Sequence, residues 1–545
     1  MSVISTHVLI VGAGPIGLAL ATDLGSRGVD CRVVERLESL DVSDPKIMHV
    51  SVRTMEFCRR LGISQAVRHW GFPEEHPQDT AFVTSMTGHE LARINVPSIA
   101  DTPPSPFSPE ETTHCPQNWF DPILRERAAA YSSVRFEYGK ELIGYDQDDN
   151  GVEARLRDVV DGAEETIHAQ YLVACDGYHS TVRPTFGVSM TGRQRVDYSV
   201  NILFRSGALR GAQPFADALR YVLIGPEGTW GTLWSVDGRD VWRLTVYGTD
   251  GAGINALDPD DAIDRLGLPG LRYEILSVTR WTRRALVAER MQDRRVFLAG
   301  DSAHVTPPNG GLGMNTGFAD AMNLGWKLAA VLEGWADAGL LDTYETERMP
   351  VVQFAVDEAM RNYTRITEDT TLDGLDADTD EGERIREELG SRLRAENVKA
   401  WRPVGVHLGY VYSSSAIVAD ASPQQSESEE SEEYEPSTIP GVRAPHAWLR
   451  DGRSTLDLFG AGYALLTFGA DRDNIAEFLR AAALHSVPVE VHDLTDQGFA
   501  SLYQRRLVLV RPDGHVAWRG DEFTDVNLLV DSLRGVRSSG DCSPR

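Results

Sequence analysis

The stretch from Thr6 to Glu35, THVLIVGAGPIGLALATDLGSRGVDCRVVE, decides the fold of this chain of 545 residues. An apolar, β-branched run ends in glycines, a helix-like segment begins at Pro15 and stops at Gly28, and a second short apolar run follows. Strand, helix and strand in this order form a βαβ unit, which predicts a parallel sheet.

The turn inside this unit is a GxGxxG motif with glycines at 12, 14 and 17. Gly12 permits the tight turn, Gly14 lets the backbone approach a pyrophosphate, and Gly17 lets helix and strand pack closely. The helix that opens at Pro15 then points its N-terminus at the phosphate charge. Glu35 ends the second strand, where an acid is expected to hold a ribose hydroxyl pair. Arg36 is either a phosphate or adenine contact or a solvated surface charge, and a glycine turn without a ligand is the alternative for the whole motif.

Length and composition bound the kind of protein. A chain of 545 residues exceeds one compact core and predicts two or three domains. The content of 42% apolar and 25% charged residues is ordinary for a soluble protein. No apolar run approaches the roughly 20 residues that a membrane span needs. The N-terminus has no basic region before its apolar stretch, which favours a buried strand over a signal peptide.

Charge and cysteine usage exclude further classes. A formal net charge of −28 argues against binding to nucleic acid or to an anionic membrane. The five cysteines are scattered, odd in number and form no CxxC pair, which predicts reduced thiols, a cytoplasmic location and no metal site built on cysteine.

Farther along, the texture of the chain changes twice. From about Asp197 to Tyr247, strand-like runs separated by glycine turns predict an inserted, mostly antiparallel sheet. The run RRVFLAGDSAH again predicts a buried strand that ends in a tight turn. A long helix is expected from about Gly317 to Trp335. An acidic polar stretch, SESEESEEYE, then precedes a small α/β segment.

Two further motifs follow buried strands. The first is Cys175-Asp176-Gly177, with Arg183 shortly after it. The second is Gly300-Asp301, followed by two prolines and the turn GGLGMN that begins at Gly310. Either alone could be an ordinary acid at the end of a strand, but together with the glycine motif their order and spacing are specific.

These three fingerprints resemble the single-component FAD-dependent aromatic hydroxylases, the group A flavoprotein monooxygenases, which include p-hydroxybenzoate hydroxylase and phenol hydroxylase. The resemblance covers about residues 5 to 360. The tail resembles the thioredoxin-like C-terminal domain of the larger members, without a CxxC motif.

The resemblance implies an α/β architecture in several parts. A doubly wound FAD-binding domain, 1–190 with 280–365, is interrupted by a sheet-rich substrate domain, 191–279. The remaining parts are a helical connection over 366–420, an acidic flexible linker over 421–440 and the thioredoxin-like domain over 441–545.

It also implies roles for single residues. Gln117 would contact FAD near its pyrophosphate or ribityl part, Asp176 would lie near FAD and the path of the nicotinamide, and Asp301 would bind the ribityl chain. Pro308 would line the reacting face of the flavin. Lys46 stands where many members have arginine, so it would keep the positive charge without the bidentate phosphate contact.

The glycine turn that contains Gly311 and Gly313 is expected to hold the flavin edge. The backbone N–H groups of Met314 and Asn315 would face flavin N1 and O2, where a helix N-terminus supplies fixed donors to the negative charge of reduced flavin.

The implied reaction is ring hydroxylation. NAD(P)H reduces FAD, oxygen adds to give a C4a-hydroperoxide, and its terminal oxygen attacks an electron-rich ring. His49, Tyr221 and Tyr247 are candidates for the base that activates a ring hydroxyl, with structural packing as the alternative for each. If His49 is that base, the rate rises with pH near neutrality.

Several alternatives stay open. The substrate is a small aromatic compound, taken together with O2: a phenol, a polyketide-derived phenol or a hydroxypyridine, with NADH or NADPH as reductant. The chain could instead be an oxidase or a Baeyer–Villiger oxygenase; the WxWxIP motif of flavin halogenases is absent. A non-catalytic flavin-binding protein is a third class. A homo-oligomer is compatible with the sequence.

Overall fold

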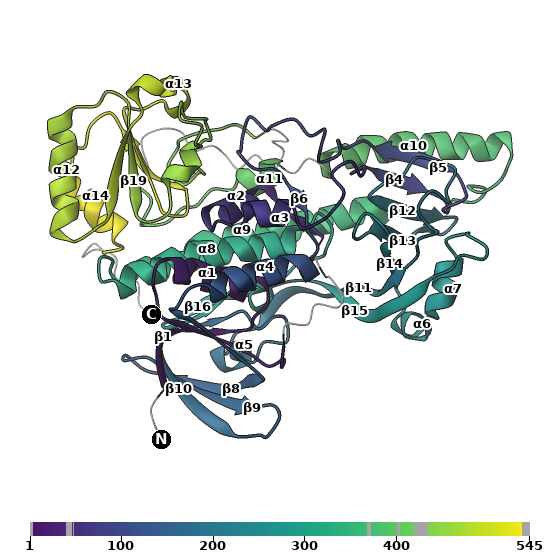
Figure 1. Ribbon diagram of the computed structural model, residues 1–545, viewed down its shortest axis with the longest axis horizontal. Coiled ribbons are helices and arrows are strands. Elements are labelled where there is room, and N and C mark those ends of the chain that lie inside the picture. Colours follow the sequence, from purple (N-terminus) through teal and green to yellow (C-terminus); the bar gives the residue numbers. More distant parts are fainter. Residues whose placement is uncertain are drawn as a thin grey trace.

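The computed structural model describes residues 4–39, 46, 48–367, 372–400, 404–418 and 434–536. A central body built on the first parallel sheet lies between a second sheet at one end and the C-terminal domain at the other (Figure 1).

The first sheet confirms the parallel arrangement expected from the opening βαβ unit. Its neighbours run β16-β17-β10-β1-β2-β7, and β8 and β9 extend it from β10. Strand β1 pairs in parallel with β2 and β10, which places Val8 beside Cys31 and Tyr171. The bounds are β1 Ile4–Val11, β2 Cys31–Glu35, β7 Val134–Tyr138, β8 Lys140–Gln147, β9 Val152–Asp158, β10 Glu164–Ala174, β16 Gln292–Asp293 and β17 Val296–Leu298.

The expected doubly wound arrangement is wrong in one respect. The helices α1 (Pro15–Ser26), α4 (Gln117–Ala129) and α8 (Leu312–Leu332) lie on one side of the parallel strands, whereas the antiparallel strands β8 and β9 lie on the other (Figure 1). Residues 140–174 alternate between polar and apolar side chains, and this pattern forms strands with one solvated face rather than a second helical layer.

The second sheet has the order β18-β15-β11-β14-β13-β12-β4-β5. It takes in β4 and β5, which the sequence-based boundaries placed in the FAD-binding domain, because β4 pairs in parallel with β12 far down the chain. Strands β11 and β15 are long enough to link this sheet to the central body (Figure 1). The bounds are β4 Thr80–Val83, β5 Glu90–Ile94, β11 Met190–Arg205, β12 Arg220–Gly225, β13 Gly228–Ser235, β14 Val241–Gly248, β15 Glu274–Ala288 and β18 His304–Val305.

The two faces of this sheet differ. One face carries Ile202, Tyr221, Leu244 and their neighbours, which form a closed apolar core. The opposite face carries buried polar side chains such as Asn201, Arg243 and Arg283. A buried polar sheet face is uncommon, because each such group must find a hydrogen-bonding or charged partner there.

The remaining helices partly match the expected helical connection. Helix α9 (Gly339–Thr367) contacts β15 and β18, and α10 (Asp380–Ala400) packs on β5 instead of merely bridging two domains. The shorter elements are α2 Val52–Arg60, α3 Ser64–Arg68, α5 Val182–Phe186, α6 Gly251–Ala256, α7 Pro259–Asp264, α11 Val404–Leu408, the 3-10 turn η1 Gly300–Ser302, and the strand pair β3 His49–Val50 with β6 Thr113–His114.

The C-terminal domain is a mixed four-stranded sheet of order β20-β19-β21-β22 with helices at its sides. Its apolar core is continuous with Trp326 of α8, so the domain packs firmly on the central body. The bounds are β19 Tyr463–Thr467, β20 Val489–Asp493, β21 Leu507–Val510, β22 Val516–Gly520, α12 Arg472–Leu484, α13 Ala500–Tyr503, α14 Val526–Leu533, η2 Thr455–Leu458 and η3 Thr495–Gln497.

The acidic linker was expected over 421–440, and this expected C-terminal boundary is too late in the chain. Residues 421–433 lie outside the described residues, but Tyr434 is buried and its hydroxyl accepts a hydrogen bond from Arg443 Nη1 at 3.0 Å. The chain from Tyr434 onward is therefore packed.

Within the described ranges, no helix is both long enough and apolar enough to cross a membrane. The same ranges contain no group of three or more His, Cys, Asp or Glu side chains arranged to hold a metal ion.

Candidate functional site

The GxGxxG turn has the geometry that its residues predict. Gly12 adopts φ +104°, and a Cβ there would lie 2.4 Å from the Cys175 carbonyl oxygen. A Cβ on Gly17 would lie 2.0 Å from the Gly12 carbonyl oxygen. Gly14 differs, since no atom lies within 4 Å of its Cβ position. The turn is closed on its protein side and open at Gly14, which is the approach that a pyrophosphate needs.

Beside this turn, a small pocket gathers four of the expected cofactor residues. Gly12, Glu35, Arg36 and Asp176 line it together with Lys140, Glu141, His179 and Thr181. Glu35 Oε2 accepts a hydrogen bond from the backbone N–H of Ala13 at 2.8 Å, which fixes the carboxylate beside the glycine turn. Its remaining lone pairs are available for hydroxyl donors.

Asp176 supplies one of the polar atoms that a ligand would satisfy. Its Oδ2 accepts the backbone N–H of Thr181 at 2.8 Å, whereas its buried Oδ1 has no hydrogen-bond partner among the described residues. Arg183 then joins this motif to the third one, because its guanidinium donates to the carbonyl oxygens of Tyr178 at 2.7 Å and Ser302 at 2.9 Å.

Asp301 lies in the turn η1. This turn is held by Asp320 and its two partners, His304 and Arg348, which the sequence did not indicate. Asp320 Oδ2 accepts the backbone N–H of Gly300 at 3.0 Å and contacts His304 Nε2 at 2.7 Å, and Asp320 Oδ1 accepts from Arg348 Nε at 2.8 Å. Burial acts to raise the pKa of Asp320, but Arg348 and His304 outweigh it and hold that pKa below its ordinary value.

The Asp301 side chain is exposed at the surface, but nearby protein atoms partly desolvate its carboxyl group. This desolvation raises the pKa of Asp301, and the charges of His304 and Lys46 only partly oppose it. A carboxylate at the surface can accept hydrogen bonds from the hydroxyl groups of a ligand.

Gln117 and Lys46 meet at the start of α4. Gln117 Oε1 accepts the backbone N–H of Lys46 at 3.3 Å, and its Nε2 donates to Asp121 Oδ2 at 2.9 Å. Burial raises the pKa of Asp121 to about 7, against the opposing effects of Gln117 and Lys46. Because the charge of Lys46 also acts on Asp301, the structure brings the α4 start and the η1 turn into one electrostatic neighbourhood.

The glycine-rich turn opens α8. Gly311 is the N-cap with φ +66°, so the first N–H groups of the helix, including that of Met314, have no partner within the helix. Asn315 braces this end: its Oδ1 accepts from Ser51 N at 2.9 Å and Thr54 Oγ1 at 2.7 Å, and its Nδ2 donates to the Gly311 carbonyl oxygen at 2.6 Å.

Pro308 lies exposed in the segment just before this turn, and its carbonyl oxygen accepts the N–H of Gly311 at 3.1 Å. Gly313 packs against Thr306. Taken together, the open backbone at Gly14, the unsatisfied Asp176 oxygen and the free N–H groups of α8 fit the pyrophosphate, ribose and ring edge of FAD.

His49 lies next to this helix end, since the Cβ position of Gly311 is 4.0 Å from His49 Cβ. Its ring packs edge-on against Trp234 at 5.4 Å. Burial, together with the nearby charges of Arg220 and Arg243, lowers the pKa of His49 to about 4. The expected titration of His49 near neutrality is therefore wrong, because the imidazole is already neutral at pH 6.

From His49 the polar face of the second sheet continues outward. Arg220 lies 5.2 Å from the Trp234 ring and hydrogen-bonds Tyr247, whose hydroxyl is also 3.2 Å from Thr232 Oγ1. Arg283 lies 4.8 Å from the Tyr247 ring, so aromatic rings and guanidinium groups alternate across this face. Tyr247 is thus on the polar face of this sheet.

Tyr221 is not. It follows Arg220 directly, and successive residues of a strand point to opposite faces, so its ring lies in the apolar core. Its hydroxyl accepts the Ala218 N–H at 2.9 Å, and burial raises its pKa, which makes it unavailable as a base. Trp230 and Trp242 belong to the same core, whereas Trp234 lies against His49.

The arginines of this polar face were not identified from the sequence, nor was the group of Asp320, His304 and Arg348 that holds the η1 turn. A signal for Arg220 and Arg243 existed: each is a charged residue inside an otherwise apolar or aromatic strand, at the alternate position that should be buried. Asp320 and Arg348 sit in helices far apart in sequence, and no local pattern pairs them.

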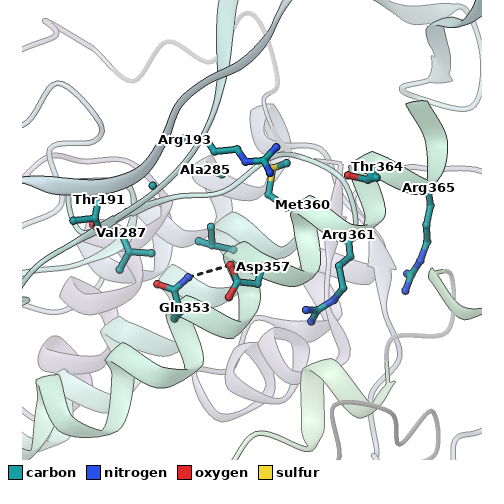
Figure 2. Close-up of a pocket in the computed structure, with 12 residues that line it drawn as sticks. Thr191, Arg193, Ala285, Val287, Gln353, Asp357, Met360, Arg361, Thr364 and Arg365 are labelled. Atoms are coloured by element: carbon teal, nitrogen blue, oxygen red, sulfur yellow. Dashed lines mark hydrogen bonds between the residues drawn. The ribbon is translucent and has the colours of Figure 1, made fainter. Parts of the chain in front are cut away.

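A larger cavity of about 780 Å³ lies between strands β11 and β15 and helix α9. Figure 2 shows Val287 and Met360 on its walls, with the Gln353 amide bonded to Asp357 across one turn of α9. On the polar sheet face, Arg283 of β15 lies 4.7 Å from the ring of Tyr363 of α9. The other lining residues are Thr191, Gly192, Arg193, Ala285, Val356, Arg361, Thr364 and Arg365.

Comparisons with known proteins agree with this geometry. A family model described as FAD binding domain matches residues 5–359, and one described as aromatic-ring hydroxylase, C-terminal, matches residues 437–537. Tetracenomycin B2 monooxygenase-dioxygenase from Streptomyces olivaceus is 34% identical over 96% of this chain and 97% of its own length. The 2,4-dichlorophenol 6-monooxygenase from Delftia acidovorans is 32% identical over 95% of both chains.

Among solved structures, RebC soaked with chromopyrrolic acid and holding 7-carboxy-K252c is 39% identical to this chain, with a TM-score of 0.91. The match covers 98% of this chain and 100% of that one. With both family models matched and relatives aligned over nearly the full length, the chain belongs to the FAD-dependent aromatic-ring hydroxylases, the group A flavoprotein monooxygenases.

Proposed function

We propose that this flavoprotein monooxygenase hydroxylates a phenol-like ring that carries an acidic group, using NAD(P)H and O2. The observation that carries the substrate class is the buried guanidinium face next to the end of α8 that would hold the flavin. Arg220 and Arg243 are at most 9% exposed and lie on the side of the second sheet that also carries Trp234 and Tyr247. Arg283 lies on the same side and is paired with the buried Asp197 at 3.3 Å.

The electrostatic effect of this face is visible at His49. Two of the three causes that lower its pKa are the charges of Arg220 and Arg243. The same positive potential would attract a carboxylate and would also favour the phenolate form of a ring hydroxyl. Aromatic side chains beside the arginines suit a flat ring. The similar protein RebC holds a carboxylated ligand, 7-carboxy-K252c, which agrees with this substrate class.

A mechanism for the chain's own residues follows. FAD, when bound, supplies electron transfer from NAD(P)H and the activation of oxygen. The α8 N-terminus at Met314 and Asn315 would steady the negative charge at the ring edge, and Asp301 and Gln117 would hold the ribityl part. The guanidinium face would hold the substrate acid and lower the pKa of its ring hydroxyl. Under this proposal no histidine base is required.

Other assignments remain part of the proposal. Pro308 would line the reacting face, Lys46 and Glu35 would contact the dinucleotide, and Asp176 would lie near the nicotinamide path. The mixed sheet and flanking helices of the C-terminal domain support a thioredoxin-like fold, and the described part of that domain contains no cysteine. A cytoplasmic location suits the reduced cysteines in the rest of the chain.

Paired substrates test the proposal. Hydroxybenzoates and larger phenolic acids should accelerate NAD(P)H oxidation and gain one oxygen, whereas their methyl esters should need a concentration at least ten times higher. Arg220→Met should abolish this preference for the acid. Arg265→Met is the matched control, since Arg265 lies 4.4 Å from the Trp230 ring, which belongs to the opposite, apolar face. Equal use of acid and ester by the native protein would refute the acidic-substrate proposal while leaving ring hydroxylation intact.

A further inference from the structure

The turn between β21 and β22 of the C-terminal domain, Arg511 to His515, is buried in the central body. Arg511, Asp513 and His515 are each at most 2% exposed. Hairpin turns usually lie at the surface, because their backbone groups need water. Here the carbonyl oxygens of Pro512 and Asp513 accept hydrogen bonds from Arg60 Nη1 at 2.7 Å and Arg53 Nη2 at 2.8 Å, both on α2.

Arg511 makes the central contact of this turn. Its guanidinium forms a bidentate ion pair with the carboxylate of Glu347 on α9, with N–O distances of 2.7 and 2.9 Å. Lys327 Nζ and Asn323 Nδ2 of α8 each donate to the same carboxylate at 2.7 Å. Burial acts to raise the pKa of Glu347, but Arg511 and Lys327 outweigh it and keep the carboxylate charged.

One route leads from this pair to the ribityl turn. Arg348 follows Glu347 on α9 and bonds Asp320, which in turn holds the Gly300 N–H beside Asp301. Tyr412 steadies Arg348, since its hydroxyl accepts from Arg348 Nη1 at 3.1 Å and its ring lies 4.2 Å from that of His515. The charged side chains that link the turn to Gly300 are all buried.

A second route leads to the flavin edge. Arg53, bonded to Asp513 of the turn, belongs to the first turn of α2. The same end of α2 holds Asn315 through the Ser51 N–H and the Thr54 hydroxyl. The hairpin is therefore linked, through α9 in one case and α2 in the other, to both turns that are proposed to meet FAD, although it lies in a different domain.

We propose that the Arg511–His515 turn positions the FAD site, with Arg511 and Arg53 as positioning residues. Bidentate and fully buried ion pairs tolerate little displacement, so the turn sets the relation between α2, α8 and α9. This gives a C-terminal domain without a cysteine pair a part in cofactor binding: it supports the backbone that meets the ribityl chain and the ring edge.

Titration of apoprotein with FAD tests the proposal, with binding measured by quenching of flavin fluorescence. Arg511→Gln should raise the FAD Kd at least tenfold and shift the two-electron potential of the bound flavin to a more negative value, because the α8 donors are displaced. Arg511→Lys keeps the charge without the bidentate grip and should lie between the variant and the native protein.

Arg59→Gln is the matched control. Arg59 also crosses from α2 to the C-terminal domain, pairing with Asp457 at 2.6 Å, but both side chains are more than 20% exposed and neither lies on a route to FAD. This control should keep its Kd within twofold and its potential unchanged. A general loss of stability would lower the melting temperature without moving the potential.

If Arg511→Gln does not fold, Arg53→Lys tests the second route, since it can still pair with Glu56 but is too short to reach Asp513 as well. Weaker FAD binding in Arg53→Lys and in Arg511→Lys supports the proposal. A native Kd and potential in any folded variant of Arg511, or in both lysine variants, overturns it.

Discussion

Replacing Asp301 with alanine should move FAD affinity and apoprotein stability in opposite directions. Nearby protein atoms partly desolvate the carboxylate and raise its pKa, and the charges of His304 and Lys46 do not cancel that effect. Because its folded pKa is raised, the charged form is disfavoured in the folded protein above its ordinary pKa, so removing the charge should not destabilise the apoprotein. The backbone of the turn stays held by the Gly300 N–H bond to Asp320 at 3.0 Å.

For FAD the same substitution removes the proposed acceptor of a ribityl hydroxyl. A lost hydrogen bond of this kind costs about 1–3 kcal/mol, which corresponds to a roughly 5- to 150-fold higher Kd. Fluorescence titration of apoprotein gives the Kd, and thermal unfolding of the apoprotein gives its stability. Asp240→Ala, at a partly exposed acid of the second sheet, is the control. An unchanged Kd, or an apoprotein that melts earlier than the native one, would refute the reasoning.

Four further outcomes are expected. Gly14→Ala should keep the apoprotein's melting temperature but lose FAD, since its Cβ meets open space, whereas Gly17→Ala should destabilise the apoprotein itself, since its Cβ would lie 2.0 Å from a carbonyl oxygen; thermal scans with and without FAD separate the two. His49→Gln should keep the native pH dependence of turnover between pH 6 and 8, because a pKa of about 4 leaves no titration there; a flattened profile in the variant would contradict this. Tyr434→Phe should lower the free energy of unfolding, measured by urea denaturation, by about 1–3 kcal/mol, because the bond to Arg443 is lost. Deleting residues 427–433 should leave turnover nearly intact.

The convergence of the residues proposed to bind FAD was predictable because each of their motifs is local. The GxGxxG turn, the acid after each strand and the glycine turn before α8 each follow a buried strand or open a helix, so sequence order alone brings them to one edge of the parallel sheet. The position of Asp176 beside Gly12 and Glu35 is the outcome of that order.

The substrate half was not predictable in the same way. Whether Tyr221 or Arg220 faces the site depends on strand register by a single residue, and register is set by pairing with β13, not by the strand's own sequence. The inclusion of β4 and β5 in the second sheet also depends on a contact between distant segments. The pKa of His49 is lowered by burial and by arginines far away in the sequence, which no motif encodes.

Oxygen transfer tests the central conclusion most directly. The holoenzyme is supplied with NAD(P)H, a phenolic acid that accelerates its oxidation, and ¹⁸O-labelled O2, and the product is analysed by mass spectrometry. The account predicts that one labelled oxygen atom enters the aromatic ring and that labelled water contributes none. A product without the label, or reductant consumed only to form hydrogen peroxide with every ring compound tried, would contradict it.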